Sequence, residues 1–272
     1  MITFVVMGAG AVAGSLGALL GIGGGVFLIP LLNVGLGLPF KTASGISLMT
    51  VIATSNVVAA SSASRRVVNM RLGMLLQIAA VGGGLYGALI VERLDARSLS
   101  LIFASVTAVI SVVMLSRLDR RNVILDSSID PGPLGGRFHE DESGREVLYR
   151  VRRLPVALGV SVGGGILSGL LGIGGGILQV PALNAWCGVP MRAAAATTAA
   201  MIGITALGSA PIYYARGHVI APLAAAAVLG VLAGSRLGMW YSGRARAKGL
   251  KLIMAVVLAA VALIYFSRSV AL

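Results

Sequence analysis

The heptapeptide LLGIGGG occurs twice in the chain, at residues 19–25 and at residues 170–176, so the two copies lie 151 residues apart. The same spacing aligns residues 14–39 with residues 165–190, where 14 of 26 positions are identical without a gap. Matched glycines and arginines continue the alignment through most of both halves. The chain is therefore a tandem duplication, and its fold has to be assembled from two related halves.

Composition places both halves in a membrane. Hydrophobic residues make up 57% of the 272 positions and charged residues only 11%, about half the share of charge in a soluble domain. Since lipid offers no partner to backbone N–H and C=O groups, long apolar segments must be helices. The sequence predicts an all-α polytopic membrane protein with apolar segments near residues 2–20, 26–38, 43–63, 72–92, 98–116, 154–171, 177–189, 194–214, 219–239 and 249–267.

The order of these segments predicts two inverted-topology repeats. Each half is expected to contain a helix hairpin broken by glycines, followed by three transmembrane helices. The hairpin starts and ends on one side, so three further crossings turn the second half upside down. With the amino terminus outside, 16 Lys and Arg residues fall inside and five outside, whereas a parallel arrangement gives about 13 and 8. The positive-inside rule favours the inverted arrangement.

A polar linker separates the two halves. Residues 119–153 combine Pro and Gly with charges of both signs, and they divide a first membrane repeat, residues 1–118, from a second, residues 154–272. This composition is typical of a loop that is flexible at least in part. The charge count places the linker in the cytoplasm.

The repeated glycines are the strongest candidates for a binding site. They break a helix inside the membrane, and the next half-helix begins with N–H groups that lack an intrahelical acceptor and with the positive end of the helix dipole. Two such ends, one from each inverted half, are expected to meet near the midplane and to hold an anion. The alternative is that the glycines only allow close helix packing. The glycines predicted to bind substrate are Gly23, Gly24, Gly25, Gly174, Gly175 and Gly176.

Two amide side chains match across the repeat and are predicted to complete the site. Asn33 and Asn184 each follow a repeated proline by three residues, and an amide without a partner in a membrane is costly. Gln179 is a further candidate, but Leu28 takes its place in the first half. The predicted site is therefore asymmetric.

Hydroxyl groups provide the remaining candidates. Ser47 and Thr198 match across the repeat, and Ser44 precedes the first of them by one helical turn. Such hydroxyls can donate to an anion. The alternative for each is a hydrogen bond to the preceding turn of its own helix.

The charged residues and the cysteine exclude several classes of function. All nine Asp and Glu residues lie in predicted loops or the linker, whereas cation transport normally uses a carboxylate within the membrane. Cys187 is the only cysteine, so a thiol-based metal site is not predicted. A membrane enzyme would need several His, Asp, Glu or Cys residues within the apolar segments, and only Cys187 has such a position, so no enzyme, catalytic residue or cofactor is predicted. We assign the formal net charge of +13 to orientation in the membrane rather than to nucleic acid binding, because the basic residues lie in loops without interleaved aromatic residues.

The duplicated motif, with a proline five residues after the last glycine of each copy, resembles that of the TauE/SafE family of sulfite exporters. The resemblance covers both halves but not the linker. It implies a transporter of the bacterial cytoplasmic membrane for sulfite, sulfonates or related anions, with substrate and direction differing between members. It also implies that the motif glycines, with Pro30 and Pro181, surround the substrate.

The predicted function is a secondary transporter that moves a small sulfur-containing anion across the cytoplasmic membrane by alternating access. An anion channel is one alternative, and a membrane anchoring or regulatory subunit that acts through the linker is another. The expected partners are the anion and membrane lipid. Self-association is left open, because helices rich in small residues can pack within one chain or between two.

Overall fold

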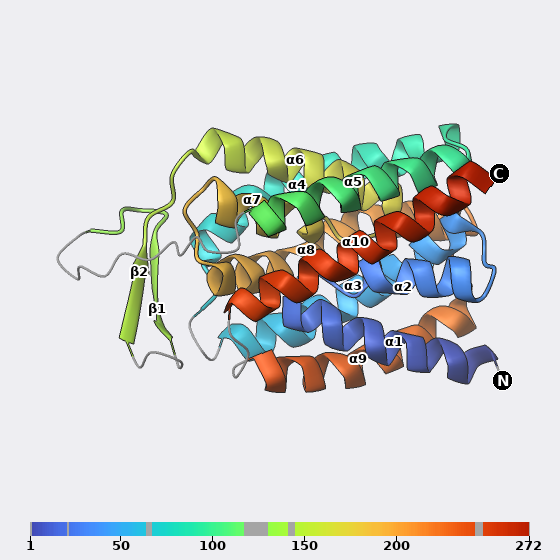
Figure 1. The fold of residues 1–272 in the computed structure, drawn as a ribbon, viewed down its shortest axis with the longest axis horizontal. Coiled ribbons are helices and arrows are strands. Elements are labelled where there is room, and N and C mark those ends of the chain that lie inside the picture. Colours follow the sequence, from blue (N-terminus) through green and yellow to red (C-terminus); the bar gives the residue numbers. More distant parts are fainter. Residues whose placement is uncertain are drawn as a thin grey trace.

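The computed structural model describes residues 2–20, 22–63, 67–116, 130–140, 145–242 and 247–271. Figure 1 shows a bundle of roughly parallel and antiparallel helices with one β-hairpin at one end. The first half contains α1 (Ile2–Leu20), α2 (Gly25–Pro30), a π-helical segment (Leu31–Gly35), α3 (Phe40–Ala63), α4 (Met70–Ile90), a short 3-10 helix (Val91–Arg93) and α5 (Ala96–Ser116). The hairpin strands are β1 (Gly136–Glu140) and β2 (Arg145–Tyr149), and the second half contains α6 (Leu154–Leu171), α7 (Gly176–Ala185), α8 (Met191–Ala215), α9 (Ala221–Ser242) and α10 (Ala247–Ala271).

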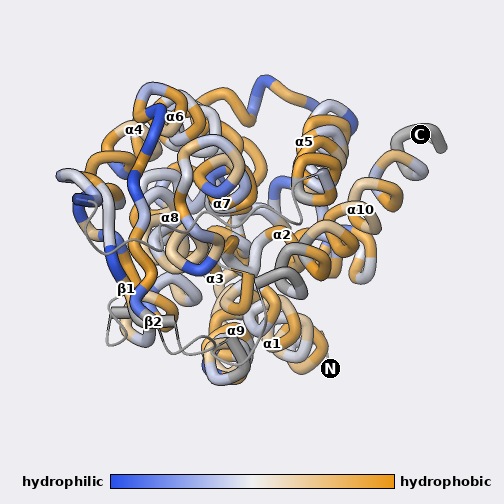
Figure 2. Tube along the Cα trace, turned by 60° about the vertical axis from the view of Figure 1, so that its left-hand side comes forward, coloured by the Kyte–Doolittle hydropathy of each residue, from blue (hydrophilic) through white to orange (hydrophobic). Residues whose placement is uncertain are grey.

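The described helices confirm a polytopic membrane protein. Seven of them are long and apolar enough to cross a bilayer: α1, α3, α4, α5, α6, α8 and α9. Large apolar side chains remain exposed on their outer faces, including Phe4 at 74% and Ile78 at 78%, and Figure 2 shows hydrophobic residues along most of the helical trace. A soluble protein would bury these side chains, so the surrounding medium has to be lipid.

The two halves interlock rather than lie side by side. α1 packs on α9, and α4 packs on α6. The repeat matches α1 with α6 and α4 with α9, so the two halves make the same contact with each other twice. A Cβ at Gly14 of α1 would overlap the backbone of Val231, and a Cβ at the matched Gly165 of α6 would overlap the backbone of Ala80. Both partners are also 151 residues apart. Only glycine lets the backbones approach so closely.

The glycine motif separates a long helix from a short one in each half. α1 and α6 end just before the motif, and α2 with its π-helical extension and α7 begin within it. Gly23 and Gly174 have φ angles of 77° and 79°, a conformation that side chains other than glycine rarely adopt. Pro30 lacks the N–H that would continue the α-helical pattern, and the π-helical turn follows it directly.

The linker contains structure that the sequence analysis did not anticipate. β1 and β2 pair as an antiparallel hairpin, with Phe138 opposite Val147, so the fold is not purely α-helical. The hairpin packs against the ends of α4, α7 and α8, where Phe138, Val147 and Tyr149 share a buried cluster with Leu72 and Cys187. Residues 130–140 and 145–153 therefore form a docked element within the predicted linker. Residues 117–129 lie outside the described residues, as does Gly21.

Asn69 attaches the hairpin to the helices. Its Nδ2 donates to Leu134 O at 2.8 Å and to Tyr149 Oη at 3.1 Å, while its Oδ1 accepts from Leu72 N and so caps α4. Its own backbone N–H donates to Thr197 Oγ1 on α8 at 2.9 Å. Burial raises the pKa of the Tyr149 hydroxyl, and the bond with Asn69 partly offsets this rise. One asparagine thus joins the linker to both halves.

Candidate functional site

The two glycine loops cross each other in the buried centre of the bundle. A Cβ at Gly25 would lie 2.9 Å from Gly172 O and 3.1 Å from Ile173 Cα. In the opposite direction, a Cβ at Gly176 would lie 2.9 Å from Ile22 Cα. Each half-helix therefore begins against the glycine loop of the other half.

Two matched aliphatic side chains pack against this crossing. Val51 of α3 and Ile202 of α8 both contact the Cβ positions of Gly23 and Gly174, at 2.6 to 3.5 Å. These residues are themselves 151 positions apart. The sequence analysis did not select them because they are apolar, although the repeat spacing alone pairs them.

The remaining motif glycines hold each loop against the helix that precedes it. A Cβ at Gly24 would lie 3.2 Å from Ala13 O, and a Cβ at the matched Gly175 would lie 2.8 Å from Gly164 O. The chain reverses direction sharply here, and a side chain at Gly24 or Gly175 would crowd the preceding helix. The six predicted glycines thus lie together, and their packing role and a binding role are compatible.

The first turns of the half-helices point their donors toward the crossing. Leu28 N donates to Gly24 O at 3.0 Å, and Gln179 N donates to Gly175 O at 3.3 Å. Helix geometry leaves the N–H groups before these, such as those of Gly25 and Gly176, without an intrahelical acceptor. Together with the helix dipoles they provide a positive potential without a charged side chain.

Hydroxyl groups from α3 and α8 surround this region. Ser47 Oγ donates to Gly172 O at 2.6 Å and so joins the halves directly. Ser44 and Thr198 are fully buried, and among the described residues their hydroxyls have no hydrogen-bond partner. Thr198 precedes Ile202 by one helical turn, as Ser47 precedes Val51. The structure therefore brings all three predicted hydroxyls to the helices that line the crossing.

Gln179 lies beside the crossing on α7. Its side chain packs on Gly164 of α6, where a Cβ added to the glycine would lie 3.3 Å from Gln179 Cγ. It is 2% exposed, and its Oε1 has no hydrogen-bond partner among the described residues. This acceptor lacks a counterpart in the first half, as the sequence predicts.

The two predicted asparagines lie at the other ends of the half-helices. Asn33 Nδ2 donates to Leu38 O at 2.8 Å, and Asn184 Nδ2 donates to Val189 O at 2.9 Å. Both bonds close the same turn before the next long helix, and Tyr265 Oη also donates to Asn33 Oδ1. Asn33 is eight residues from Gly25, roughly 12 Å along a helix. The structure does not bring the asparagines to the glycine crossing.

A tyrosine near the end of α8 fixes one of the loops. Tyr213 Oη donates to Gly169 O at 2.9 Å and to Leu170 O at 3.0 Å. These carbonyls close α6 immediately before the second glycine loop. Nothing in the sequence pattern indicates this contact, because α6 and α8 belong to the same half and are not each other's counterparts in the repeat.

Comparisons with known proteins identify the family to which the chain is similar. A family model described as "Sulfite exporter TauE/SafE" matches residues 6–265. The probable membrane transporter protein YunE of Bacillus subtilis (strain 168) is 27% identical over 256 residues, which cover 92% of each chain. The probable membrane transporter protein MJ0441 of Methanocaldococcus jannaschii is 26% identical over 264 residues, which cover 92% of this chain and 90% of that protein. No solved structure matches the chain.

Proposed function

The chain belongs to the sulfite exporter TauE/SafE family, and from this premise we propose that it carries a small sulfur-containing anion, such as sulfite or an organosulfonate, across the membrane by alternating access. Membership makes it a membrane transporter rather than an enzyme. The membrane we propose is the bacterial cytoplasmic membrane, with the linker in the cytoplasm.

The observation that carries the proposal is the meeting of two half-helix amino termini at the buried glycine crossing. A sulfur oxyanion presents several oxygen acceptors, which backbone N–H groups and the hydroxyls of Ser44, Ser47 and Thr198 can satisfy. None of the helices α1–α10 contains Asp or Glu over its described length. Such a site favours anions over cations.

Alternating access is supported by the directions in which the first helices of the two halves run. α1 begins at the end of the bundle where both chain termini lie, whereas α6 begins at the opposite end, beside the hairpin (Figure 1). Two halves in opposite orientations can exchange conformations and so open the site to either side in turn. Because the glycine loops are in contact, the anion enters only when they separate, and we take the present conformation to be occluded.

Uptake of labelled sulfite and methanesulfonate into proteoliposomes tests the proposal. We expect saturable flux in the wild type, and a loss of about tenfold or more at low anion concentration in the Ser47→Ala/Thr198→Ala variant, because hydrogen bonds to a charged group are the stronger ones. Thr107→Ala is the matched control, since Thr107 is buried on α5 and bonds to Phe103 O and Ala104 O of its own helix.

The outcomes separate this function from its alternatives. Flux that does not saturate would indicate a channel. Absence of flux for every oxyanion would contradict transport and support the anchoring or regulatory subunit, provided that a thermal unfolding transition shows the protein to be folded. A pH gradient across the vesicles, imposed in a separate arm, shows whether protons move with the anion.

A further inference from the structure

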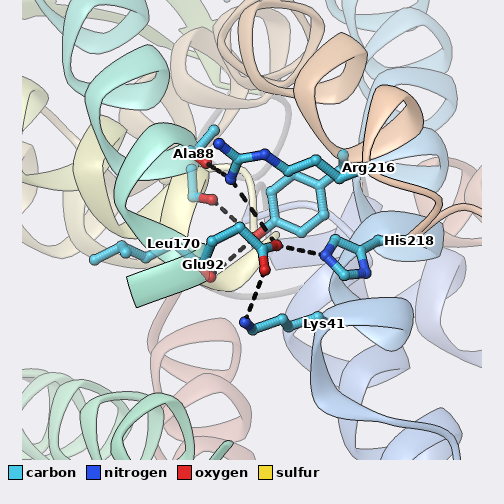
Figure 3. Close-up of polar contacts among 8 residues, drawn as sticks. Lys41, Ala88, Glu92, Leu170, Arg216 and His218 are labelled. Carbon is cyan, nitrogen blue, oxygen red and sulfur yellow. Dashed lines mark hydrogen bonds and ion pairs between the residues drawn. The ribbon is translucent and has the colours of Figure 1, made fainter. Parts of the chain in front are cut away.

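Three basic side chains converge on one carboxylate at the end of the bundle opposite the hairpin. This carboxylate belongs to Glu92, in the 3-10 helix after α4, and its Oε2 lies 3.2 Å from Lys41 Nζ. Its other oxygen, Oε1, lies 2.5 Å from His218 Nε2 and 3.9 Å from Arg216 Nη1. Figure 3 shows all four side chains pointing toward one another from separate segments.

This cluster is held in place by the surrounding backbone. Arg216 Nη1 also donates to Ala88 O, near the end of α4, at 3.1 Å. The His218 ring packs edge-on against Tyr213 with the ring centroids 6.0 Å apart, and the His218 carbonyl lies against Gly45 of α3. The side chains of Lys41, Arg216 and His218 are only 21% to 31% exposed. They are therefore partly buried and preorganised, unlike long side chains on an open surface.

The cluster carries more positive than negative charge. Lys41 and Arg216 contribute two permanent positive charges, whereas Glu92 contributes one negative charge. Partial burial strengthens the field of these charges relative to bulk water. An anion that replaced the Glu92 carboxylate would meet the same three donors in the same geometry.

The cluster stands at the outer end of a helix face that leads to the glycine crossing. On α3, Lys41 is followed by Ser44, Ser47 and Val51 at spacings of three, three and four residues, which places them on one face. Ser44 O lies against Gly172, Ser47 Oγ donates to Gly172 O, and Val51 packs on Gly174. An anion that leaves the cluster thus meets two hydroxyl-bearing residues before it reaches the crossing.

The four residues also join the two halves. Lys41 and Glu92 belong to the first half, and Arg216 and His218 belong to the second. Displacement of Glu92 would break the ion pairs that hold the halves together at this end. Binding of an anion and opening of this end are therefore coupled through the same contacts.

We propose that Lys41, Arg216 and His218 form an anion-capture site, and that Glu92 is a built-in competing anion which the incoming substrate displaces. This inference rests on the proposed anion transport and adds a second site to it, at the end of the molecule. It also gives Glu92 a role in closing that end when no anion is present.

Anion binding to the purified full chain tests the inference independently of transport. Sulfate and methanesulfonate are titrated against gluconate at constant ionic strength, and the thermal midpoint is followed at each concentration. Removing the competitor in Glu92→Gln is expected to lower the half-saturating anion concentration about tenfold, and to lower the midpoint without anion because the basic groups then repel one another. Lys41→Gln is expected to raise the half-saturating concentration about tenfold.

Asp95→Asn and Arg97→Gln are the matched controls, because both are exposed residues at the same end of the bundle and neither contacts Glu92 in the described structure. They should leave the half-saturating concentration unchanged. If Glu92→Gln fails to fold, Lys41→Gln carries the test alone.

Unchanged or weaker anion binding in Glu92→Gln, or unchanged binding in Lys41→Gln, would overturn the inference. Flux in proteoliposomes together with that result would leave the proposed function standing. Conversely, the expected binding changes in a wild type that transports no anion would retain the capture site and reject the transport proposal. Repeating the titration in the Ser47→Ala/Thr198→Ala background separates this site from the glycine crossing.

Discussion

At the scale of single residues, a repeated polar side chain has two explanations that the sequence cannot separate. Asn33 and Asn184 are matched, lie in apolar surroundings and follow a proline, which are properties expected of substrate ligands. In the structure each amide instead bonds to the backbone five residues later. Contact with a substrate and a hydrogen bond to the backbone both give a buried amide the partner that it needs. The sequence pattern is therefore the same for both roles.

Replacing the asparagines distinguishes these roles. Asn33→Ala and Asn184→Ala should each destabilise the protein by about 1–2 kcal/mol, because the turn loses a buried hydrogen bond. Thermal unfolding in detergent measures the loss, and Asn56→Ala, at an exposed position of α3, is the control. The half-saturating anion concentration should not change. A tenfold increase in that concentration, with the thermal midpoint preserved, would instead mean that the amides contact the substrate.

At the scale of elements, the hairpin alters the picture of the linker. Turn residues and mixed charge are typical of both disordered loops and hairpins, and the decisive contacts come from remote parts of the chain. Phe138 and Tyr149 are buried only because the first turns of α4 and α8 meet the last turn of α7 at this place. The linker therefore covers one end of the bundle, and its removal would expose the apolar side chains beneath it.

Cys187 reports on this docking. It is fully buried beneath the hairpin, and burial raises the pKa of its thiol, an effect that the nearby Arg153 partly opposes. A raised pKa means less thiolate at pH 7 to 8, so alkylation by a maleimide should be slow there and should accelerate as the pH rises. Asn69→Ala, which removes the cap of α4 and both bonds to the linker, should increase the rate at least tenfold.

Tyr149→Phe is the graded control for that experiment, because it removes one of the two bonds and keeps the aromatic ring. Its rate should lie between those of the wild type and Asn69→Ala. Equal alkylation rates in all three proteins would show that the hairpin does not protect Cys187.

At the scale of the whole molecule, the halves depend on each other. The close glycine contacts join α1 to α9 and α4 to α6, so they run between halves. Ser47 Oγ bonding to Gly172 O adds a polar link at the centre. Each half alone would present its small-residue face and a glycine loop without the complementary surface.

A chain divided within residues 119–129 tests this dependence. The two segments expressed together should associate one to one and purify through a tag on either segment, because all of the close helix contacts between them can still form. The segment 1–118 expressed alone should aggregate or be degraded. Its purification as a stable monomer would contradict the interlocked arrangement.

The sequence by itself determined the duplication, the helical membrane architecture, the ten apolar segments and the position of the glycine breaks. Periodicity, composition and spacing are local properties, and lipid leaves apolar segments of this length little alternative to helix. Only the tertiary structure decided that Val51 and Ile202 lie at the crossing, that the asparagines close turns, and that Lys41, Glu92, Arg216 and His218 meet. These outcomes depend on contacts between residues far apart in the chain, such as Lys41 and Glu92 at 51 positions or His218 and Glu92 at 126, or on a choice between equally satisfactory partners. Neither is encoded in any local pattern.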